Sequence, residues 1–270
     1  MNESKYSDLI AKIQRKRKWV IALTIIAVVL VVLFTTPMKI EVMGDAVVDY
    51  KGLHPVLTVL LVLVCFFVEA IVYAVVSLPL NTSMEQECDP EKHIILNMRL
   101  NKQKNIDHIY AADYLYLGNY SESLKHSEKM IESSNEQMVL AGLFNRARCE
   151  FLLGDYECFC QTADEFERRL SSPLKLNSKI IITYQKINDV LKLMRAIFEN
   201  DVEKINELRG NIDVGNASRA VEGYLNYIRG VAAYKVEDRE EAIYRFKSVR
   251  ENCSKTVFAK LSDEYLSLLK

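Results

Sequence analysis

The fold is indicated by the stretch AADYLYLGNY at residues 111–120, an apolar helical pattern that ends at Gly118. A related stretch, ARCEFLLGDY, follows at residues 147–156, and its Gly154 stands 36 positions after Gly118. Glycine followed by Asn or Asp is typical of a chain reversal, and the apolar residues before it have helical spacing. The repetition predicts pairs of antiparallel helices joined by tight turns.

Two weaker copies follow, with predicted turns at 200–202 and 237–239. The interval before the third copy is longer and contains Ser-Ser-Pro at 171–173, which predicts an inserted loop or a lengthened helix. Asp-Pro-Glu at 89–91 predicts a helix start, because Asp can cap a helix and proline is compatible with its first position. Strand-like alternation is scarce, so the fold class is predicted to be all-α, with a final capping helix at 256–269.

This arrangement resembles the tetratricopeptide repeat (TPR) family, whose units of about 34 residues pair two antiparallel helices and stack into a superhelix. The resemblance covers roughly residues 105–250, although no copy ends in the usual proline and Phe159 stands where a small residue is usual. It implies a TPR-like α-solenoid of antiparallel helix pairs over residues 105–270. It also implies that proteins bind to the concave surface formed by the first helix of each pair.

The resemblance also assigns candidate residues to that concave surface. Because Tyr and Arg residues often anchor interfaces, Tyr116, Arg148 and Tyr227 are the predicted partner contacts. The alternative is that such aromatic residues simply pack between helices. The family's clamp for a C-terminal carboxylate is not carried over, because His108 and Ala112 stand where it would begin. The full set assigned to the surface is His108, Ala112, Tyr116, Phe144, Arg148, Phe151, Tyr224, Tyr227 and Tyr234.

Two apolar segments precede this region. Residues 19–38 and 55–80 have 20 and 26 residues, and about 20 apolar residues in a helix suffice to cross a bilayer. They predict a transmembrane hairpin with residues 39–54 as an external loop. Residues 81–104 are then a linker and a leading helix.

The basic residues predict the orientation of this hairpin. Residues 1–18 carry six basic side chains against two acidic ones, a net charge of +4, and Lys and Arg favour the cytoplasmic side. Two crossings return the chain to the side from which it started, so both termini are predicted to be cytoplasmic. A cleavable signal peptide is the open alternative, because a basic stretch before an apolar one is typical of both. In that case residues 55–80 would be a single anchor.

Glu69 interrupts the second apolar segment near its middle. A charge there costs about 2.5 to 3.5 kcal/mol on insertion scales, so this carboxyl group is predicted to be neutral or to have a partner. Contact between helices and an ion or proton pathway are both open interpretations.

The sequence contains no HExxH, GxSxG or dinucleotide-binding motif. Gly210 and Gly215 have the spacing of a phosphate-binding loop, but Asn216 and Ala217 replace its Lys and Ser or Thr. Six cysteines without a CxxC pair are interpreted as reduced thiols. We therefore predict no catalytic residue, no cofactor and no metal site. From residue 81 onward 27 basic residues face 30 acidic ones, so nucleic acid is not an expected partner.

The sequence as a whole predicts a membrane-anchored scaffold for protein–protein interaction that presents its TPR-like domain to the cytoplasm. Its predicted partners are a protein or peptide of unknown identity and the lipid bilayer, with self-association left open. The alternative is an accessory or regulatory subunit of a transporter or channel complex that acts through the hairpin and Glu69. A helical-repeat enzyme acting through His93, His108 or His126 is a third hypothesis.

Overall fold

The computed structural model describes residues 3–35, 38–42, 46–50, 55–100, 106–173, 176–212 and 218–270. It divides into two compact units, one covering Asn2–Asn81 and the other Thr82–Lys270. We call the first unit the helical pair and the second the helical array.

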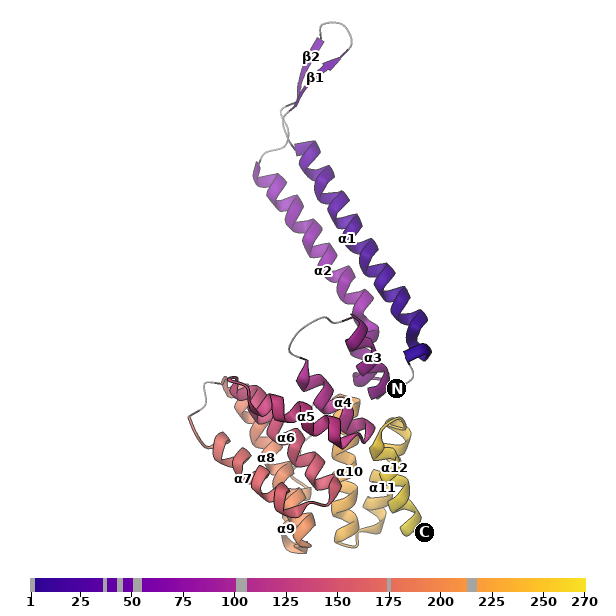
Figure 1. Ribbon diagram of the computed structural model, residues 1–270, viewed down its shortest axis with the longest axis vertical. Coiled ribbons are helices and arrows are strands. Elements are labelled where there is room, and N and C mark those ends of the chain that lie inside the picture. The colour runs from indigo at the N-terminus through magenta and orange to yellow at the C-terminus, as the bar shows by residue number, and fades with distance from the viewer. Residues whose placement is uncertain are drawn as a thin grey trace. The chain divides into compact units, whose positions relative to one another are not determined.

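The helical pair contains two long helices joined by a small hairpin (Figure 1). Strands β1 and β2 pair antiparallel, with Met38 opposite Tyr50. The predicted loop at 39–54 therefore contains a short β-hairpin, since the β-branched residues of KIEV and AVVDY favour extended structure. The elements are η1 (Glu3–Tyr6), α1 (Ser7–Thr35), β1 (Met38–Val42), β2 (Ala46–Tyr50) and α2 (Pro55–Glu85).

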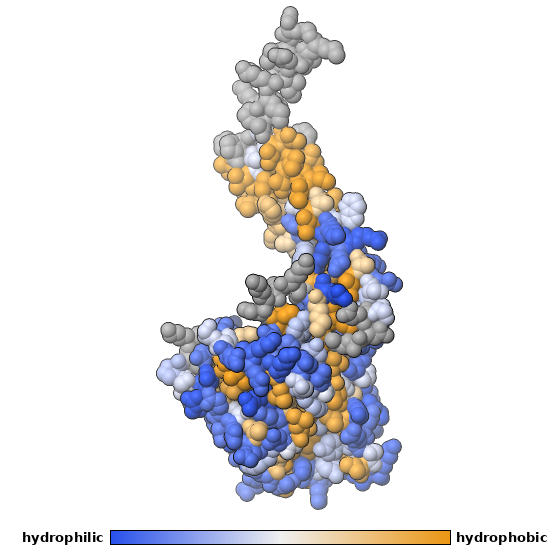
Figure 2. Space-filling view, viewed as in Figure 1, coloured by the Kyte–Doolittle hydropathy of each residue, from blue (hydrophilic) through white to orange (hydrophobic). Residues whose placement is uncertain are grey.

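Large apolar side chains of the helical pair face outward. Trp19 in α1 is 63% exposed and Phe67 in α2 is 68% exposed. Among the described residues, the segment Val56–Leu80 of α2 is the one that is long and apolar enough to cross a membrane. Hydrophobic residues cover much of the described surface of α1 and α2 (Figure 2).

One arginine links the two helices of the pair. The Arg17 guanidinium donates from Nη2 to Ser77 Oγ at 2.7 Å and lies 4.7 Å from the centroid of the Tyr73 ring. This contact joins the basic end of α1 to the end of α2, so the two helices run antiparallel.

The helical array is all-α in its described residues, and its successive helices lie side by side as hairpins (Figure 1). The hairpins are α4 with α5, α6 with α7, α8 with α9, and α10 with α11. The bounds are α3 (Pro90–Leu100), α4 (Asp107–Leu117), α5 (Tyr120–Ile131), α6 (Glu136–Leu153), α7 (Tyr156–Leu170), α8 (Ser178–Glu199), α9 (Val202–Arg209), α10 (Arg219–Lys235), α11 (Arg239–Asn252) and α12 (Val257–Leu268).

Each predicted turn joins the two helices of one hairpin. Gly118 and Gly154 end α4 and α6 with φ of 78° and 76°, a left-handed conformation that glycine adopts without strain. Asn200 and Glu237 reach φ of 52° and 60° at the glycine-free turns. The second helix of each hairpin then begins after a side chain that accepts a backbone N–H bond: Asn119, Asp155, Asp201 and Asp238.

The start of α3, the length of α8 and the C-terminal helix α12 were also predicted from the sequence. Asp89 Oδ1 accepts a bond of 3.0 Å from the Lys92 amide, which starts α3 as predicted. The long interval before the third turn contains α8, whose 22 residues confirm the lengthened helix. The predicted capping helix is α12, which begins one residue after Thr256.

Helix α12 also packs against the first hairpin, which the sequence did not predict. It contacts α4 and α10 in addition to α11. The Phe258 ring meets that of Tyr116 at 5.3 Å, and Lys255 Nζ lies 2.7 Å from Asp89 Oδ2. A Cβ atom on Gly118 would lie 2.9 Å from Val257 Cγ2. The C-terminal end of the array therefore packs against its N-terminal end.

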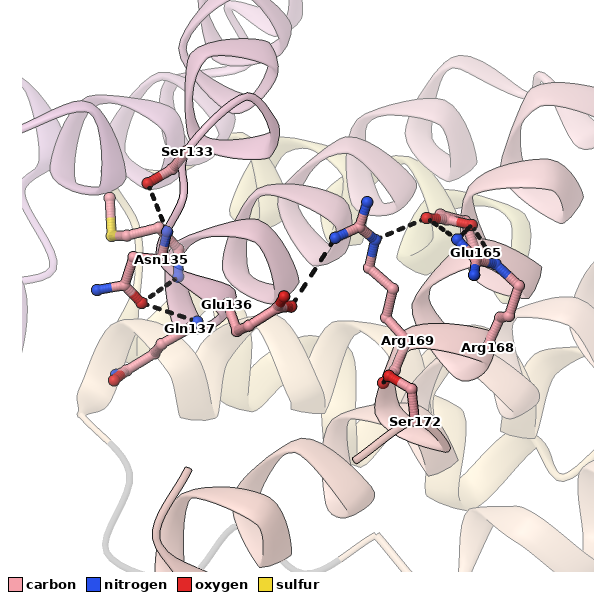
Figure 3. Close-up of polar contacts among 9 residues, drawn as sticks. Ser133, Asn135, Glu136, Gln137, Glu165, Arg168, Arg169 and Ser172 are labelled. Carbon is pink, nitrogen blue, oxygen red and sulfur yellow. Dashed lines mark hydrogen bonds and ion pairs between the residues drawn. The ribbon is translucent and has the colours of Figure 1, made fainter. Parts of the chain in front are cut away.

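Polar contacts at the surface join α6 to α7 (Figure 3). Asn135 Oδ1 accepts from the Gln137 amide at 2.9 Å and caps α6. Arg169 of α7 lies 2.6 Å from a Glu165 oxygen and 3.8 Å from a Glu136 oxygen at the start of α6. Exposed ion pairs contribute about 0 to 1 kcal/mol, so the buried aromatic side chains dominate the stability of the array. The largest of these are Phe159, Phe166, Tyr224, Phe246 and Phe258.

Candidate functional site

The helical array contains a partly open cavity of about 660 Å³. Its walls come mainly from α4, α6, α8 and α10, the first helix of each hairpin, with Met84 and His93 completing one side. Small-molecule sites typically have volumes of about 300 to 1,000 Å³. The cavity therefore has the size of a ligand site.

The walls are mostly apolar, and several polar residues lie at the mouth. Thr183 and Lys186 of α8 are exposed there, and Asp189 is partly buried. Val221 of α10 is 40% exposed and completes the mouth. The apolar lining farther in includes Ile109, Ala112, Phe144, Ile187, Val190, Ile212 and Leu225.

Arg148 of α6 is the cation of the inner wall and is 5% exposed. Its guanidinium carbon lies 4.5 Å from the ring centroid of Phe144, 5.0 Å from that of Tyr224 and 5.8 Å from that of Tyr116. Such cation–π contacts stabilise a desolvated guanidinium. Nη2 donates to Asn145 Oδ1, whereas Nε is buried without a hydrogen-bond partner among the described residues. No carboxylate in the described part of the chain forms an ion pair with this guanidinium.

Two tyrosines, Tyr116 and Tyr224, lie beside Arg148. The Tyr116 hydroxyl is buried and has no hydrogen-bond partner among the described residues. Burial raises the pKa of Tyr116 to about 12, although the nearby Arg148 guanidinium lowers it. Burial also raises the pKa of Tyr224, whose hydroxyl donates to Met194 Sδ at 3.2 Å. Both phenols are therefore neutral at physiological pH.

An ionisable pair lies on the side of the cavity formed by α3 and α4. His93 Nδ1 lies 2.6 Å from Asp113 Oδ2. Burial raises the pKa of the Asp113 carboxyl group, and the hydrogen bond to His93 lowers it. This pair joins α3 to α4, so the Asp113 carboxyl group already has His93 as a hydrogen-bond partner.

The predicted contact residues lie inside the array. Tyr116 and Arg148 meet at the cavity wall. Tyr227 is 5% exposed, and its ring packs 5.4 Å from Phe258 and 6.2 Å from Phe246. It does not line the cavity, and it offers no exposed surface to a partner. Tyr224, one helical turn earlier, occupies the position facing Arg148.

The remaining assigned residues also divide between the cavity and its surroundings. Ala112 and Phe144 line the cavity. Phe151 packs instead 4.9 Å from the Phe198 ring, outside the lining. The repeat pattern gave no signal for Thr183, Ile187 or Val190, because α8 lies in the copy where that pattern is weakest.

Thiols and metal ligands form no site of their own in the described residues. All six cysteines are free, and Cys88, Cys149 and Cys253 are buried. Among the residues with a described position, no group of three or more His, Cys, Asp or Glu side chains is placed to hold a metal ion.

Glu69 lies in the helical pair, at a separate space of about 310 Å³ between α1 and α2. Val20, Leu23 and Ala27 face it from α1. Thr24, the other polar residue there, donates its hydroxyl to the Val20 carbonyl. The carboxyl group of Glu69 is thus directed toward the neighbouring helix, where polar side chains in membrane proteins usually lie.

Comparison with known proteins gives no further assignment. The chain matches no protein-family model, no curated protein and no solved structure at a significant level. Its function is therefore argued from the residues and geometry described above.

Proposed function

We propose that this protein is a membrane-anchored scaffold whose helical array is a TPR-like α-solenoid that binds a protein partner. The observation that supports this most is the cavity lined by the first helices of four successive hairpins. Helical-repeat domains use such a surface for binding, because repeats stacked side by side align equivalent helices along one face.

The helical pair is the proposed anchor. The apolar segment Val56–Leu80 supports one crossing, and the outward-facing apolar residues of α1 between Trp19 and Leu33 support a second. Arg15, Lys16 and Lys18, which lie in α1 just before its apolar part, favour a cytoplasmic N-terminus, which would place the array on the same side. Anchoring raises the effective concentration of the array near membrane-bound partners.

We place the proposed contact at the mouth of the cavity, because exposed side chains lie there. Tyr116, Arg148 and Tyr227 are buried, whereas Thr183 and Lys186 are exposed at the mouth. Ile182, next to Thr183 on α8, is 52% exposed, so the mouth region combines apolar and charged contact groups. A protein segment lying across α8 and α10 would cover this surface.

Site-specific crosslinking in native membranes tests the proposal. We expect p-benzoylphenylalanine placed at Thr183 or Val221 of the full-length protein to crosslink to a discrete partner. The same probe at Tyr244, which is 63% exposed on α11, should not. Lys186→Glu should reduce the crosslink, whereas Lys125→Glu on the exposed face of α5 should leave it unchanged. Equal crosslinking at Thr183, Val221 and Tyr244 would contradict the proposed binding surface.

A second function is favoured by the position of Glu69 beside α1. In this alternative the protein is an accessory subunit of a transporter or channel complex, and the carboxyl group contributes to assembly in the membrane. Glu69→Gln keeps the shape of the side chain and removes its charge. Loss of a membrane complex on native gels, with crosslinking at Thr183 unchanged, would favour this function over the scaffold.

A further inference from the structure

The energetics of Arg148 point to a missing partner. Burying a charged group is unfavourable unless it is paired and hydrogen-bonded. The three aromatic rings around Arg148 offset part of that cost, and Asn145 accepts one bond. Among the described residues, Nε still has no hydrogen-bond acceptor, and neither has the proton of the neighbouring Tyr116 hydroxyl. The described array therefore holds a buried cation and a buried hydroxyl donor that its own residues do not satisfy.

The acidic side chains that line the cavity, and Glu150 close to Arg148 on α6, have other partners or lie at the mouth. Asp113 is bonded to His93 at 2.6 Å, and Glu150 pairs with Arg146 at 2.8 Å on the same helix. Asp189 is partly exposed where the cavity opens. None of these carboxylates forms an ion pair with Arg148 in the described part of the array.

The surroundings of Arg148 indicate which kind of ligand group could bind its guanidinium. Arginine binds carboxylate and phosphate groups through paired N–H donors. The remaining wall of the cavity is mostly apolar and includes Ile187, Val190 and Leu225. An adjoining hollow of about 390 Å³ shares Arg148, Phe144 and Ile187 with the main cavity. The guanidinium thus lies at the junction of two largely apolar spaces.

We propose that this cavity binds a small amphiphilic anion, with a carboxylate or phosphate head at Arg148 and Tyr116 and an apolar tail along α8 and α10. The cavity volume of about 660 Å³ is that of a small-molecule site. This function goes beyond scaffolding, because the ligand occupies the interior while the protein partner contacts the mouth.

Calorimetric titration of the full-length protein in phosphatidylcholine nanodiscs tests the assignment. The probes are octanoate, octyl phosphate and the neutral 1-octanol, each corrected for empty nanodiscs. We expect at least one anion to bind about tenfold or more tightly than 1-octanol, as hydrogen bonds to charged groups are worth about 1.5 to 3 kcal/mol. The two anions distinguish a carboxylic acid from a phosphate lipid as the source of the head group. Binding of 1-octanol as tightly as both anions would overturn the proposal.

Substitution of Arg148 provides the matched test. Arg148→Met should weaken anion binding about tenfold or more while leaving 1-octanol binding unchanged. It should not lower the melting temperature of the ligand-free protein, since it removes an unsatisfied buried charge. Arg168→Met, on the exposed face of α7, is the control and should bind like the wild type. Unchanged anion binding by Arg148→Met would overturn the proposal.

Two further variants keep the test informative if Arg148→Met does not fold. Tyr116→Phe removes only the unpartnered hydroxyl and should weaken anion binding severalfold. Ile187→Trp fills the proposed tail space and should weaken binding of both the anions and 1-octanol. Full anion affinity in both variants would place the ligand elsewhere. Crosslinking at Thr183 without ligand reports on the protein partner alone, so failure of this inference is distinguishable from failure of the scaffold proposal.

Discussion

The helical pair and the helical array contain similar apolar side chains that face opposite environments. Phe67 of α2 is 68% exposed, whereas Phe246 of α11 is fully buried. In α2 the apolar residues surround the helix, and in amphipathic helices such as α7 they follow one face. The arrangement of apolar residues around each helix, more than their number, therefore distinguishes an element suited to lipid from one suited to a water-soluble core.

The largest expected effect comes from the core of the array. Phe246→Ala should destabilise it by about 3 to 5 kcal/mol, because the ring is fully buried and stacks 4.9 Å from Tyr265. Phe67→Ala is the matched change in the helical pair and should leave the unfolding of the array unchanged. Denaturant unfolding of the full-length protein in nanodiscs, followed by hydrogen exchange of α10 and α11, measures both. Equal losses would remove the distinction between the two regions.

The next effect concerns membrane insertion. Phe67→Arg places a charge near the centre of Val56–Leu80 and should make insertion about 2.5 to 3.5 kcal/mol less favourable. Phe67→Leu keeps the apolar surface and serves as the control. Carbonate extraction of membranes should release a larger fraction of the arginine variant. If both variants stay equally membrane-bound, α2 alone does not determine the anchoring.

The comparison also shows which parts of the fold the sequence could predict. The turns between paired helices were predictable because Gly118 and Gly154 mark left-handed positions. Asn-Asp at 200–201 likewise provides both a helix end and a cap for the next helix. The β-hairpin was missed because the segment 38–50 was interpreted only as a connection between apolar helices. Local signals of this kind do not depend on distant residues.

The buried site depends on contacts that local patterns do not encode. Arginine is usually exposed, so the burial of Arg148 follows only from the packing of Phe144 and Tyr224 around it. The burial of Tyr227 could not be read from its own repeat, because its ring packs against Phe258, more than 30 positions later. The packing of α12 on α4 left no recognisable signal in the sequence.

A pair of glycine substitutions measures that packing within the array. Gly154→Ala should cost about 1 to 2 kcal/mol through its left-handed backbone alone, because a Cβ atom there has no neighbour within 4 Å. Gly118→Ala should cost more, because its Cβ atom would also approach Val257 of α12 at 2.9 Å. Thermal or denaturant unfolding compares the two variants. Equal losses would show that α12 does not press on the first hairpin.

The smallest expected effect lies on the surface of the array. Arg169→Met removes the ion pairs with Glu165 and Glu136 shown in Figure 3 and should change stability by about 0 to 1 kcal/mol. The side chains of Arg169 and Glu165 are each 32% exposed, so solvent screens the pair. A loss as large as that of Phe246→Ala would mean that the surface network, more than the aromatic core, holds α6 and α7 together. The same unfolding assay measures it.

The most direct measurement of the central claim is protease protection of the full-length protein in sealed vesicles of known orientation. The account predicts that residues 82–270 are digested when the cytoplasmic face is outside and protected when it is inside. A fragment containing Val56–Leu80 should remain with the membrane in both cases. Digestion of the array from the exterior of intact cells, or release of the whole chain from the membrane, would contradict it.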